Sequence, residues 1–531
     1  MQQRKYDVCV IGSGAAGGTL ATALAQQGAD VVLIEGGPYR DPAKLNTHAW
    51  PWERGRPQVP AVDVNLDHEP YLNVGDPVSI ARARVLGGRT THWNAVSLRF
   101  AADDFREWSA AGIEEDWPIS YNEIAPYYDR AERLMVVCGT RENLEVLPDG
   151  EFIKPLPLRC SEQILRRASA KFGLRLIPVR KALASEPGHG RLNCHYCGHC
   201  MEGCSVSAIF NTAEHVIPKG HETGRLELRT GWMAHELIAD REGRVRTVRL
   251  VEREASRQEE VRADVFAVCG GNVESARLLL NSRSPRFPIG LANNNDVVGR
   301  YLHGHSTAQT LGILKDLVGR KYWNQDGATD HAYIPRFQPY RKPDYAGGFG
   351  FQVNVRSYMI PHHARHLPGY GPGFKRAVRQ MFPAHSVLLG FGKVLAAAHN
   401  RITLHPTRTD ANGLPIPVVN FHWGSNDRAM HRDMFRTAAE IYQEAGVVLL
   451  HHDSGGMGGF ASHEVGTVRM GNDPKTSVLN RWNQAREVPN LFVVDGSCFT
   501  TFPEKNPTLT IVALALRAAD SILSLKGRNE L

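Results

Sequence analysis

The feature that most constrains the fold is a glycine-rich loop between an apolar run and a helix-forming stretch near the start of the chain. Residues 6–11 read as a short strand, and residues 19–25 are rich in helix formers. Gly12, Gly14 and Gly17 stand between them with the spacing Gly-x-Gly-x-x-Gly. The first glycine permits a tight turn, the second lets the backbone approach a pyrophosphate, and the third lets the helix pack on the strand. Free N–H groups at the helix N-terminus favour that anion, so the loop predicts an α/β fold that binds a dinucleotide.

A second short strand, residues 31–34, ends in Glu35, which stands eighteen residues after Gly17. An acid at this place accepts a hydrogen bond from the ribose of the adenosine half. The loop fits NAD and FAD alike, and its position at the beginning of a long chain favours FAD. We expect Ala15 and Ala16 to contact the same cofactor.

Length and composition restrict the remaining classes of protein. At 531 residues the chain has room for two or three domains, or for one two-lobed α/β protein. The net charge is +7 without a block of Lys and Arg, so we expect no nucleic-acid partner. No apolar run approaches the roughly 18 residues of a membrane helix. The strand before the glycine loop starts at Tyr6, which leaves no room for a secretory signal. We therefore expect a cytoplasmic protein, or a periplasmic one if a signal-bearing partner carries it.

A second glycine-rich stretch lies at residues 85–95. Its two adjacent glycines allow a ligand close to the backbone, and the tryptophan that follows is suited to pack against a ring. His92 has two readings, either as a contact to the cofactor or as a core histidine bonded to a carbonyl. The candidate cofactor contacts in this stretch are Gly87, Gly88, Thr91, His92, Trp93, Asn94 and Ala95.

Four of the nine cysteines fall within eleven residues: Cys194, Cys197, Cys200 and Cys204. Such clustering favours a metal or redox site over a disulfide framework. The spacing C-x2-C-x2-C-x3-C matches the bacterial ferredoxin run, except that Ser205 replaces the usual proline. In ferredoxins the fourth cysteine serves a second cluster, and the three ligands that remain suit a three-iron cluster. Zinc fits the tight spacing less well, and a loop of structural thiols without metal stays open.

The middle of the chain returns to the cofactor sheet and then enters a second lobe. Residues 226–251 are β-rich, and a strand at 261–268 leads through Gly270 into a helix at 274–280. From about residue 306 to residue 460 no helical period dominates, which predicts a mixed antiparallel sheet with long loops. Several histidines of this part of the chain lack an accompanying carboxylate pattern, which disfavours a metal site: His303, His305, His331, His362 and His363.

Together these segments resemble the glucose–methanol–choline (GMC) family of FAD oxidoreductases. The resemblance is carried by the N-terminal loop, by the Gly-Gly-Arg-Thr-Thr-His-Trp stretch, and by blocks at 290–293, 298–302, 400–404, 463–471, 490–497 and 506–510. It spans most of the chain but little of 306–398, the variable substrate lobe of the family. It implies a Rossmann-type FAD-binding domain with a mixed or antiparallel substrate domain. The implied boundaries are 1–305 for the FAD domain with the Cys-rich loop 194–204 inserted, 306–459 for the substrate domain, and 460–531 for a return to the FAD domain that carries the catalytic residues.

The family pattern also implies which further residues hold the cofactor. In some members the equivalent of His92 is bonded covalently to the flavin 8α-methyl group, and in others FAD is held without that bond, so both states stay open. The branches most similar to this chain are the pyranose oxidases and the catalytic subunits of bacterial sugar dehydrogenases. The additional cofactor contacts implied are Ala234, Gly270, Asp495, Asn506, Pro507 and Thr508.

Some of those dehydrogenase subunits carry a three-iron (3Fe-4S) cluster that passes flavin electrons to a cytochrome. Cys200 and Cys204 match the last two cluster ligands by position, and Cys197 or Cys194 would supply the third. The implied partners are a small subunit and a cytochrome c that accepts the electrons.

The resemblance also assigns roles to His463 and Asn506. Oxidising an alcohol requires a base for the hydroxyl proton and an acceptor for the hydride, which is the flavin N5. Neutral His463 is the implied base. Asn506 orients the substrate oxygen, and the helix that starts at Pro507 directs its N-terminus at the flavin N1 and C2 oxygen. The alternatives are a structural role for His463 and a helix-capping role for Asn506.

The implied function is FAD-dependent oxidation of a secondary alcohol of a sugar or glycoside to the keto product, with electrons passed to a partner cytochrome or another acceptor. The alternative is an oxidase of a sugar or other alcohol that uses O₂ and forms hydrogen peroxide. A working cluster and a partner chain favour the dehydrogenase. A non-sugar secondary alcohol is the alternative substrate.

Overall fold

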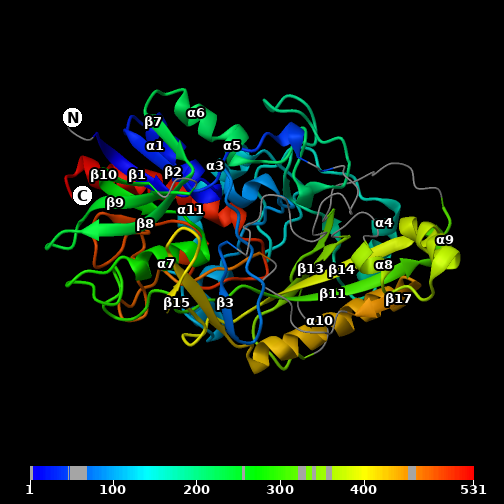
Figure 1. The fold of residues 1–531 in the computed structure, drawn as a ribbon. Coiled ribbons are helices and arrows are strands. Elements are labelled where there is room, and N and C mark those ends of the chain that lie inside the picture. Colours follow the sequence, from blue (N-terminus) through cyan, green and yellow to red (C-terminus); the bar gives the residue numbers. More distant parts are fainter. Residues whose placement is uncertain are drawn as a thin grey trace.

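The computed structural model describes residues 4–45, 47, 68–253, 257–320, 331–337, 342–354, 361–452 and 462–531. Within these residues the chain builds two large sheets, which lie toward opposite ends of the molecule (Figure 1). Helices cover both sheets, and smaller sheets and loops lie between them.

The first sheet has seven strands in the order β7-β2-β1-β10-β9-β8, with β18 paired to β10. Its centre is parallel, because β1 pairs with β2 and β10 in the same direction, as β2 does with β7 and β10 with β18. β9 and β8 extend it in the antiparallel sense. The strand bounds are β1 (Lys5–Ile11), β2 (Val31–Glu35), β7 (Leu226–Thr230), β8 (Trp232–Ala239), β9 (Val245–Glu252), β10 (Gln258–Val268) and β18 (Leu491–Val493).

The predicted N-terminal strand, loop and helix are confirmed. β1 leads through the glycine loop into α1 (Ala15–Gln26), and β2 follows. Every residue of β2 is buried, as expected for a parallel strand that is covered on both faces. The β-rich stretch after residue 226 is confirmed as β7, β8 and β9, and β10 is followed by the expected helix, α7 (Asn272–Asn281).

The C-terminal helix α11 (Thr508–Gly527) packs against α1 and α3 (Tyr121–Met135). Figure 1 shows it in red beside the blue N-terminal elements. Contrary to the expectation from the sequence, α11 is long and apolar enough to cross a membrane by length and composition alone, but 72% of its most apolar window is buried inside the protein. A core helix of a folded domain has the same character. At the start of α3, Ser120 and Glu123 form the capping box expected from their spacing.

The second sheet has six strands, all antiparallel, in the order β17-β11-β14-β13-β12-β5. It confirms the antiparallel sheet predicted for the second lobe, although β5 comes from an earlier part of the chain. The bounds are β5 (Ile177–Pro178), β11 (His305–Leu314), β12 (Ala332–Ile334), β13 (Phe349–Val353), β14 (His385–Lys393) and β17 (Val447–His452). The predicted domain boundaries stay predictions.

The prediction of a mixed antiparallel sheet with long loops did not include the helices of this lobe. The twenty-residue helix α10 (Ser425–Glu444) packs against β11, β14 and β17. Its buried stripe includes Met430, Met434 and Ala438, which recur at helical spacing. The helical period of α10 is hard to see in the sequence because small, polar and flexible residues make up much of its buried face. α9 (Gly371–Met381) is a second helix of this lobe.

The remaining elements are short or lie between the two large sheets. A three-stranded sheet contains β15 (Arg401–Thr409), β16 (Pro415–Phe421) and β3 (Leu72–Gly75), and a two-stranded one contains β4 (Val137–Cys138) and β6 (Lys181–Ala182). The other α-helices are α2 (Glu107–Ala111), α4 (Cys160–Ala170), α5 (Thr212–His215), α6 (Ile217–His221) and α8 (Pro361–Ala364).

Candidate active site

A cavity of about 890 Å³ begins at the carboxyl ends of the parallel strands and reaches the second sheet. Such a crevice is where ligands bind in open α/β sheets. Most of the predicted site residues come together in its wall: Gly12, Gly14, Ala15, Ala16, Glu35, Gly88, His92, Trp93, Asn94, Ala95, Ala234, Gly270, His463, Asp495, Asn506, Pro507 and Thr508. Gly17, Gly87, Thr91 and the four clustered cysteines do not line it.

The glycine loop has no room for side chains. Gly12 has φ +100°, and a Cβ there would lie 2.4 Å from the carbonyl oxygen of Cys269. A Cβ on Gly17 would lie 1.7 Å from the Gly12 oxygen, so Gly17 permits close packing of α1 rather than contact with a ligand. Across the cavity, a Cβ on Gly88 would lie 3.1 Å from the Cα of Gly14. The two glycine-rich stretches therefore meet backbone to backbone.

The N-terminus of α1 is suited to an anion. Gly14 is its N-cap, no side-chain hydrogen bond from the described residues caps it, and its first turn carries no acid. Ala15 and Ala16 of that first turn line the cavity. Uncapped N–H groups and the positive end of the helix dipole favour a phosphate there. This end of the cavity fits the pyrophosphate of a dinucleotide.

Glu35 lines the cavity and also holds the glycine loop in place through hydrogen bonds. Its Oε2 accepts hydrogen bonds from the backbone N–H of Ser13 (3.1 Å) and from the Ser13 hydroxyl (2.6 Å). Its Oε1 accepts from the N–H of Gly37 at 2.8 Å. Burial raises the pKa of Glu35, against the effect of these hydrogen bonds. Each carboxylate oxygen has more than one lone pair, so Glu35 keeps capacity for a ribose hydroxyl.

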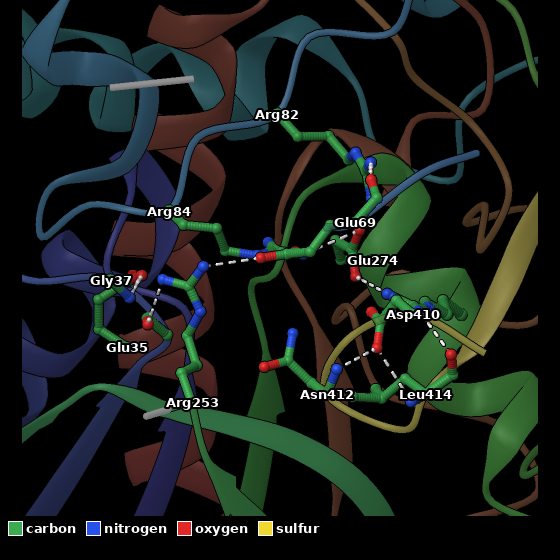
Figure 2. A network of polar contacts seen from close by, with 12 residues as sticks. Glu35, Gly37, Glu69, Arg82, Arg84, Arg253, Glu274, Asp410, Asn412 and Leu414 are labelled. Atoms are coloured by element: carbon green, nitrogen blue, oxygen red, sulfur yellow. Dashed lines mark hydrogen bonds and ion pairs between the residues drawn. The ribbon is translucent and has the colours of Figure 1, made fainter. Parts of the chain in front are cut away.

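A network of buried ion pairs adjoins Glu35 and was not found by sequence reasoning (Figure 2). Arg84 donates to Glu69 at 2.9 Å, and Arg82 donates to Glu274 at 2.8 Å. Arg253 donates to the other oxygen of Glu69 at 2.9 Å. Nearby arginines hold the pKa of Glu274 far below its usual value, in spite of burial. Arg82, Arg84 and Glu274 line the cavity, so this network gives its wall a fixed pattern of charge.

His463 and Asn506 meet in the same wall. The Nε2 of His463 and the Nδ2 of Asn506 are 3.2 Å apart. Burial, the neighbouring His305 and the charge of Arg89 hold the pKa of His463 well below its usual value, so the ring is neutral. The Asn506 Oδ1 accepts a hydrogen bond from Nε2 of Gln352 at 2.8 Å, which turns the Asn506 amide N–H₂ group toward His463. The pair therefore joins a neutral base to an oriented donor.

The helix α11 begins at Thr508 with Pro507 as its N-cap, and no side chain of the described residues caps it. Asn506 is therefore not the cap of this helix, since its side chain bonds to His463 and Gln352 instead. The predicted helix start at Pro507 is one residue early, which is within the usual uncertainty of helix ends. Pro507 and Thr508 line the cavity, so the positive end of the helix dipole lies at its wall.

The stretch after Gly87 turns through a short 3₁₀ helix at Gly88–Thr91. The Thr91 hydroxyl and His92 Nδ1 are 2.9 Å apart, and the indole N–H of Trp93 donates to the carbonyl of Phe210 at 2.8 Å. These contacts fix both rings beside the cavity. A covalent bond from His92 to a flavin stays a prediction.

The structure gives no support to the iron–sulfur prediction. Burial raises the pKa of Cys194 to about 12 and that of Cys197 to about 11, so both are thiols in the metal-free protein. Across the part of the chain that the structure describes, no three His, Cys, Asp or Glu side chains converge on a common point that could hold a metal ion. Cys200 and Cys204 instead line a small separate pocket beside the segment that carries Trp93. The iron–sulfur cluster therefore stays a prediction that the described residues do not support.

A dinucleotide cleft that also holds a neutral histidine beside an oriented asparagine defines an FAD-dependent oxidoreductase that acts on alcohols. The chain belongs to the GMC oxidoreductase family, because two family models described as GMC oxidoreductase match residues 6–307 and 396–515. Members of this family bind FAD, and the glycine loop, the uncapped N-terminus of α1 and the size of the cavity fit that cofactor.

The chain is similar to several curated relatives over nearly its whole length. It is 30% identical to 2-methyl-1,2-propanediol dehydrogenase of Mycolicibacterium austroafricanum, over 97% of this chain and 95% of that protein. It is 27% identical to the fructose dehydrogenase large subunit of Gluconobacter japonicus, over 98% of both chains. It is 30% identical to 6'''-hydroxyparomomycin C oxidase of Streptomyces lividus, over 98% and 92%.

Among solved structures, the fold is similar to pyridoxine 4-oxidase from Mesorbium loti. The TM-score is 0.65 at 18% sequence identity, over 97% of this chain and 99% of that one. The shared architecture is the GMC fold.

Proposed function

We propose that the protein oxidises a secondary alcohol of a sugar or glycoside to the keto product, with FAD as the hydride acceptor and His463 as the base. The observation that carries this proposal is the 3.2 Å contact between His463 Nε2 and Asn506 Nδ2 in the wall of the dinucleotide cavity. Neutral imidazole is suited to take the hydroxyl proton. Fructose dehydrogenase and 6'''-hydroxyparomomycin C oxidase are named for a sugar and an aminoglycoside, which supports this substrate class.

FAD and the protein's own side chains have separate roles in the proposed reaction. FAD, when bound, supplies the acceptor for the hydride. His463 accepts the hydroxyl proton, and Asn506 donates a hydrogen bond to the substrate oxygen. Gln352 keeps the Asn506 amide in the orientation that allows this. The N-terminus of α11 brings a partial positive charge to the cavity wall, which favours negative charge that develops there.

The base is tested by His463→Ala in an anaerobic stopped-flow experiment. Wild type and variant, each loaded with FAD, are mixed with D-fructose, D-gluconate, paromamine, pyridoxine and 2-methyl-1,2-propanediol, and bleaching of the flavin absorbance is followed. We expect the variant to keep FAD and to lose reduction by roughly 10²–10⁴-fold, the usual contribution of a general base. His399→Ala, at an exposed histidine outside the cavity, is the control. Reduction of the His463 variant at the wild-type rate would mean that another group is the base.

We further propose that the protein is a dehydrogenase, whose electrons leave to a partner cytochrome or another acceptor rather than to O₂. The fructose dehydrogenase relative is named as a large subunit, which supports a small-subunit partner and an external acceptor such as a cytochrome c. Two similar relatives are instead named as oxidases. Mixing the substrate-reduced enzyme with air-saturated buffer separates the two cases. Rapid reoxidation with stoichiometric hydrogen peroxide would establish the oxidase and refute the dehydrogenase.

A further inference from the structure

Directly behind His463 lies a second histidine that the proposed mechanism has not used. His305 is the first residue of β11, is completely buried, and does not line the cavity. Its ring stacks on Phe502 with centroids 4.3 Å apart and an interplanar angle of 15°, and it meets Phe391 edge-on at 5.4 Å. A polar ring in such an apolar enclosure is costly unless its nitrogens are hydrogen-bonded.

Both ring nitrogens of His305 are at hydrogen-bond distance from a partner, and one of the two partners can only accept. The Nε2 lies 2.7 Å from the carbonyl oxygen of Pro503. A carbonyl can only accept, so the proton must be on Nε2 of His305. Burial lowers the pKa of His305 to about 3, so the ring carries one proton and its Nδ1 bears a lone pair.

The lone pair on His305 Nδ1 determines which ring nitrogen of His463 carries the proton. The Nδ1 atoms of His305 and His463 are 2.9 Å apart. Because His305 Nδ1 can only accept, the Nδ1 of His463 must donate and therefore carries the proton of that neutral ring. The Nε2 of His463 is left unprotonated, and its lone pair faces the Asn506 amide N–H₂ group at 3.2 Å.

We propose that His305 is a positioning residue, which holds His463 in the Nδ1-protonated tautomer so that Nε2 is free to take the alcohol proton. This inference rests on the proposed role of His463 as the base. In the reaction the O–H bond breaks and its proton goes to His463 Nε2, while the carbon-bound hydrogen leaves with its electron pair to FAD and the carbonyl forms. The same Nδ1–H···Nδ1 bond then stabilises the protonated His463 ring, because hydrogen bonds from charged donors are stronger.

Two substitutions separate this role from simple packing. His305→Phe keeps a ring that can stack on Phe502 but removes the acceptor for His463. His305→Asn loses the stacking but keeps an oxygen near the place of Nδ1. If His305 acts as proposed, flavin reduction by the fastest alcohol of the panel slows about tenfold to a hundredfold in the Phe variant, the range for a lost bond to a charged group. In the Asn variant it stays within about threefold of wild type.

The reverse order, with the Phe variant fast and the Asn variant slow, would assign His305 to packing and overturn the proposal, as would two variants at the wild-type rate. FAD content is expected to be unchanged in both. The control is His385→Leu on the neighbouring strand β14, which removes another buried histidine that does not line the cavity.

A measurement on the wild-type holoenzyme needs no substrate. Long-range ¹H–¹⁵N spectra of protein labelled in its histidine rings report which nitrogen of each neutral ring is protonated. The signals of His463 are assigned by their loss in His463→Gln. We expect a protonated Nδ1 and a bare Nε2. A protonated Nε2 would overturn the proposal for His305 even if His463→Ala abolishes reduction, and a rapid His463→Ala enzyme would instead refute the base itself.

Discussion

His385 should make the stability of the protein depend on pH in a way that one substitution removes. It opens β14 and is buried, and neither ring nitrogen has a hydrogen-bond partner among the described residues. Burial alone lowers its pKa to about 3. In an unfolded chain a histidine titrates near 6.5. Between these values the unfolded chain binds a proton that the folded protein does not.

The sign and size follow from this difference. Because the unfolded state binds more protons, the free energy of unfolding falls as the pH falls below about 6.5, by roughly 1.4 kcal/mol for each pH unit. At pH 4.5 the loss from His385 is about 2.7 kcal/mol, and it would end only near the folded pKa. His385→Leu carries no titrating group at this position. The stability of the variant relative to wild type should therefore rise by about 2.7 kcal/mol between pH 7.5 and pH 4.5.

The assay is urea unfolding of both FAD-loaded proteins, followed by tryptophan fluorescence at pH 7.5, 6.0, 5.0 and 4.5. All other titrating groups are shared, so they cancel in the difference between the two proteins. Val387→Ala, two residues along the same strand, is the matched control, because it removes packing but no titrating group. A difference between His385→Leu and wild type that is constant with pH would refute the assignment of a neutral ring without hydrogen-bond partners.

Three further outcomes are expected. Gly12→Ala should yield protein with little FAD, measured as the ratio of flavin to protein absorbance, because its Cβ would lie 2.4 Å from the Cys269 oxygen at φ +100°; normal FAD content would contradict the geometry of the loop. Gln352→Leu should slow flavin reduction about two- to twelvefold at unchanged FAD content, since Asn506 loses one neutral hydrogen bond; a wild-type rate in stopped flow would exclude that role. The rate of flavin reduction should be flat from about pH 6.5 to pH 8 and fall only in more acid solution, because burial keeps His463 neutral; a midpoint at or above pH 6.5 would show a protonatable base.

The two parts of the cavity differ in how far their residues could be predicted from the sequence. The glycine loop folds on itself within six residues, so spacing alone predicts its turn, its close packing and its anion site. Gln352 and His305 lie 154 and 158 residues from the partners they hold. Only the pairing of β13 and β11 with opposite edges of β14 in the second sheet brings them there, and no local pattern encodes that pairing. The catalytic pair was predictable through family resemblance, whereas its supporting side chains were not.

Two other differences between the predictions from the sequence and the structure have local physical causes. α10 buries methionines, alanines and threonine instead of a stripe of branched residues, so its helical period is weak in the sequence. The cysteine run has the spacing of a cluster motif, but spacing does not fix where the sulfur atoms point. Cys194 and Cys200 are buried in the core beside apolar neighbours, and at Cys194 this burial raises the pKa of the thiol to about 12.

The packing of α11 on α1 has a consequence for how this protein is made. During synthesis α1 leaves the ribosome long before α11, since nearly 500 residues separate Gln26 from Thr508. At about 5–20 residues per second this takes roughly 25–100 s. During that time the apolar side chains of α1, such as Leu20 and Leu24, lack one of the helices that pack against α1 in the native protein. The nascent chain should therefore depend on chaperones until its C-terminal helix emerges, and a chain arrested before residue 508 should fail to retain flavin.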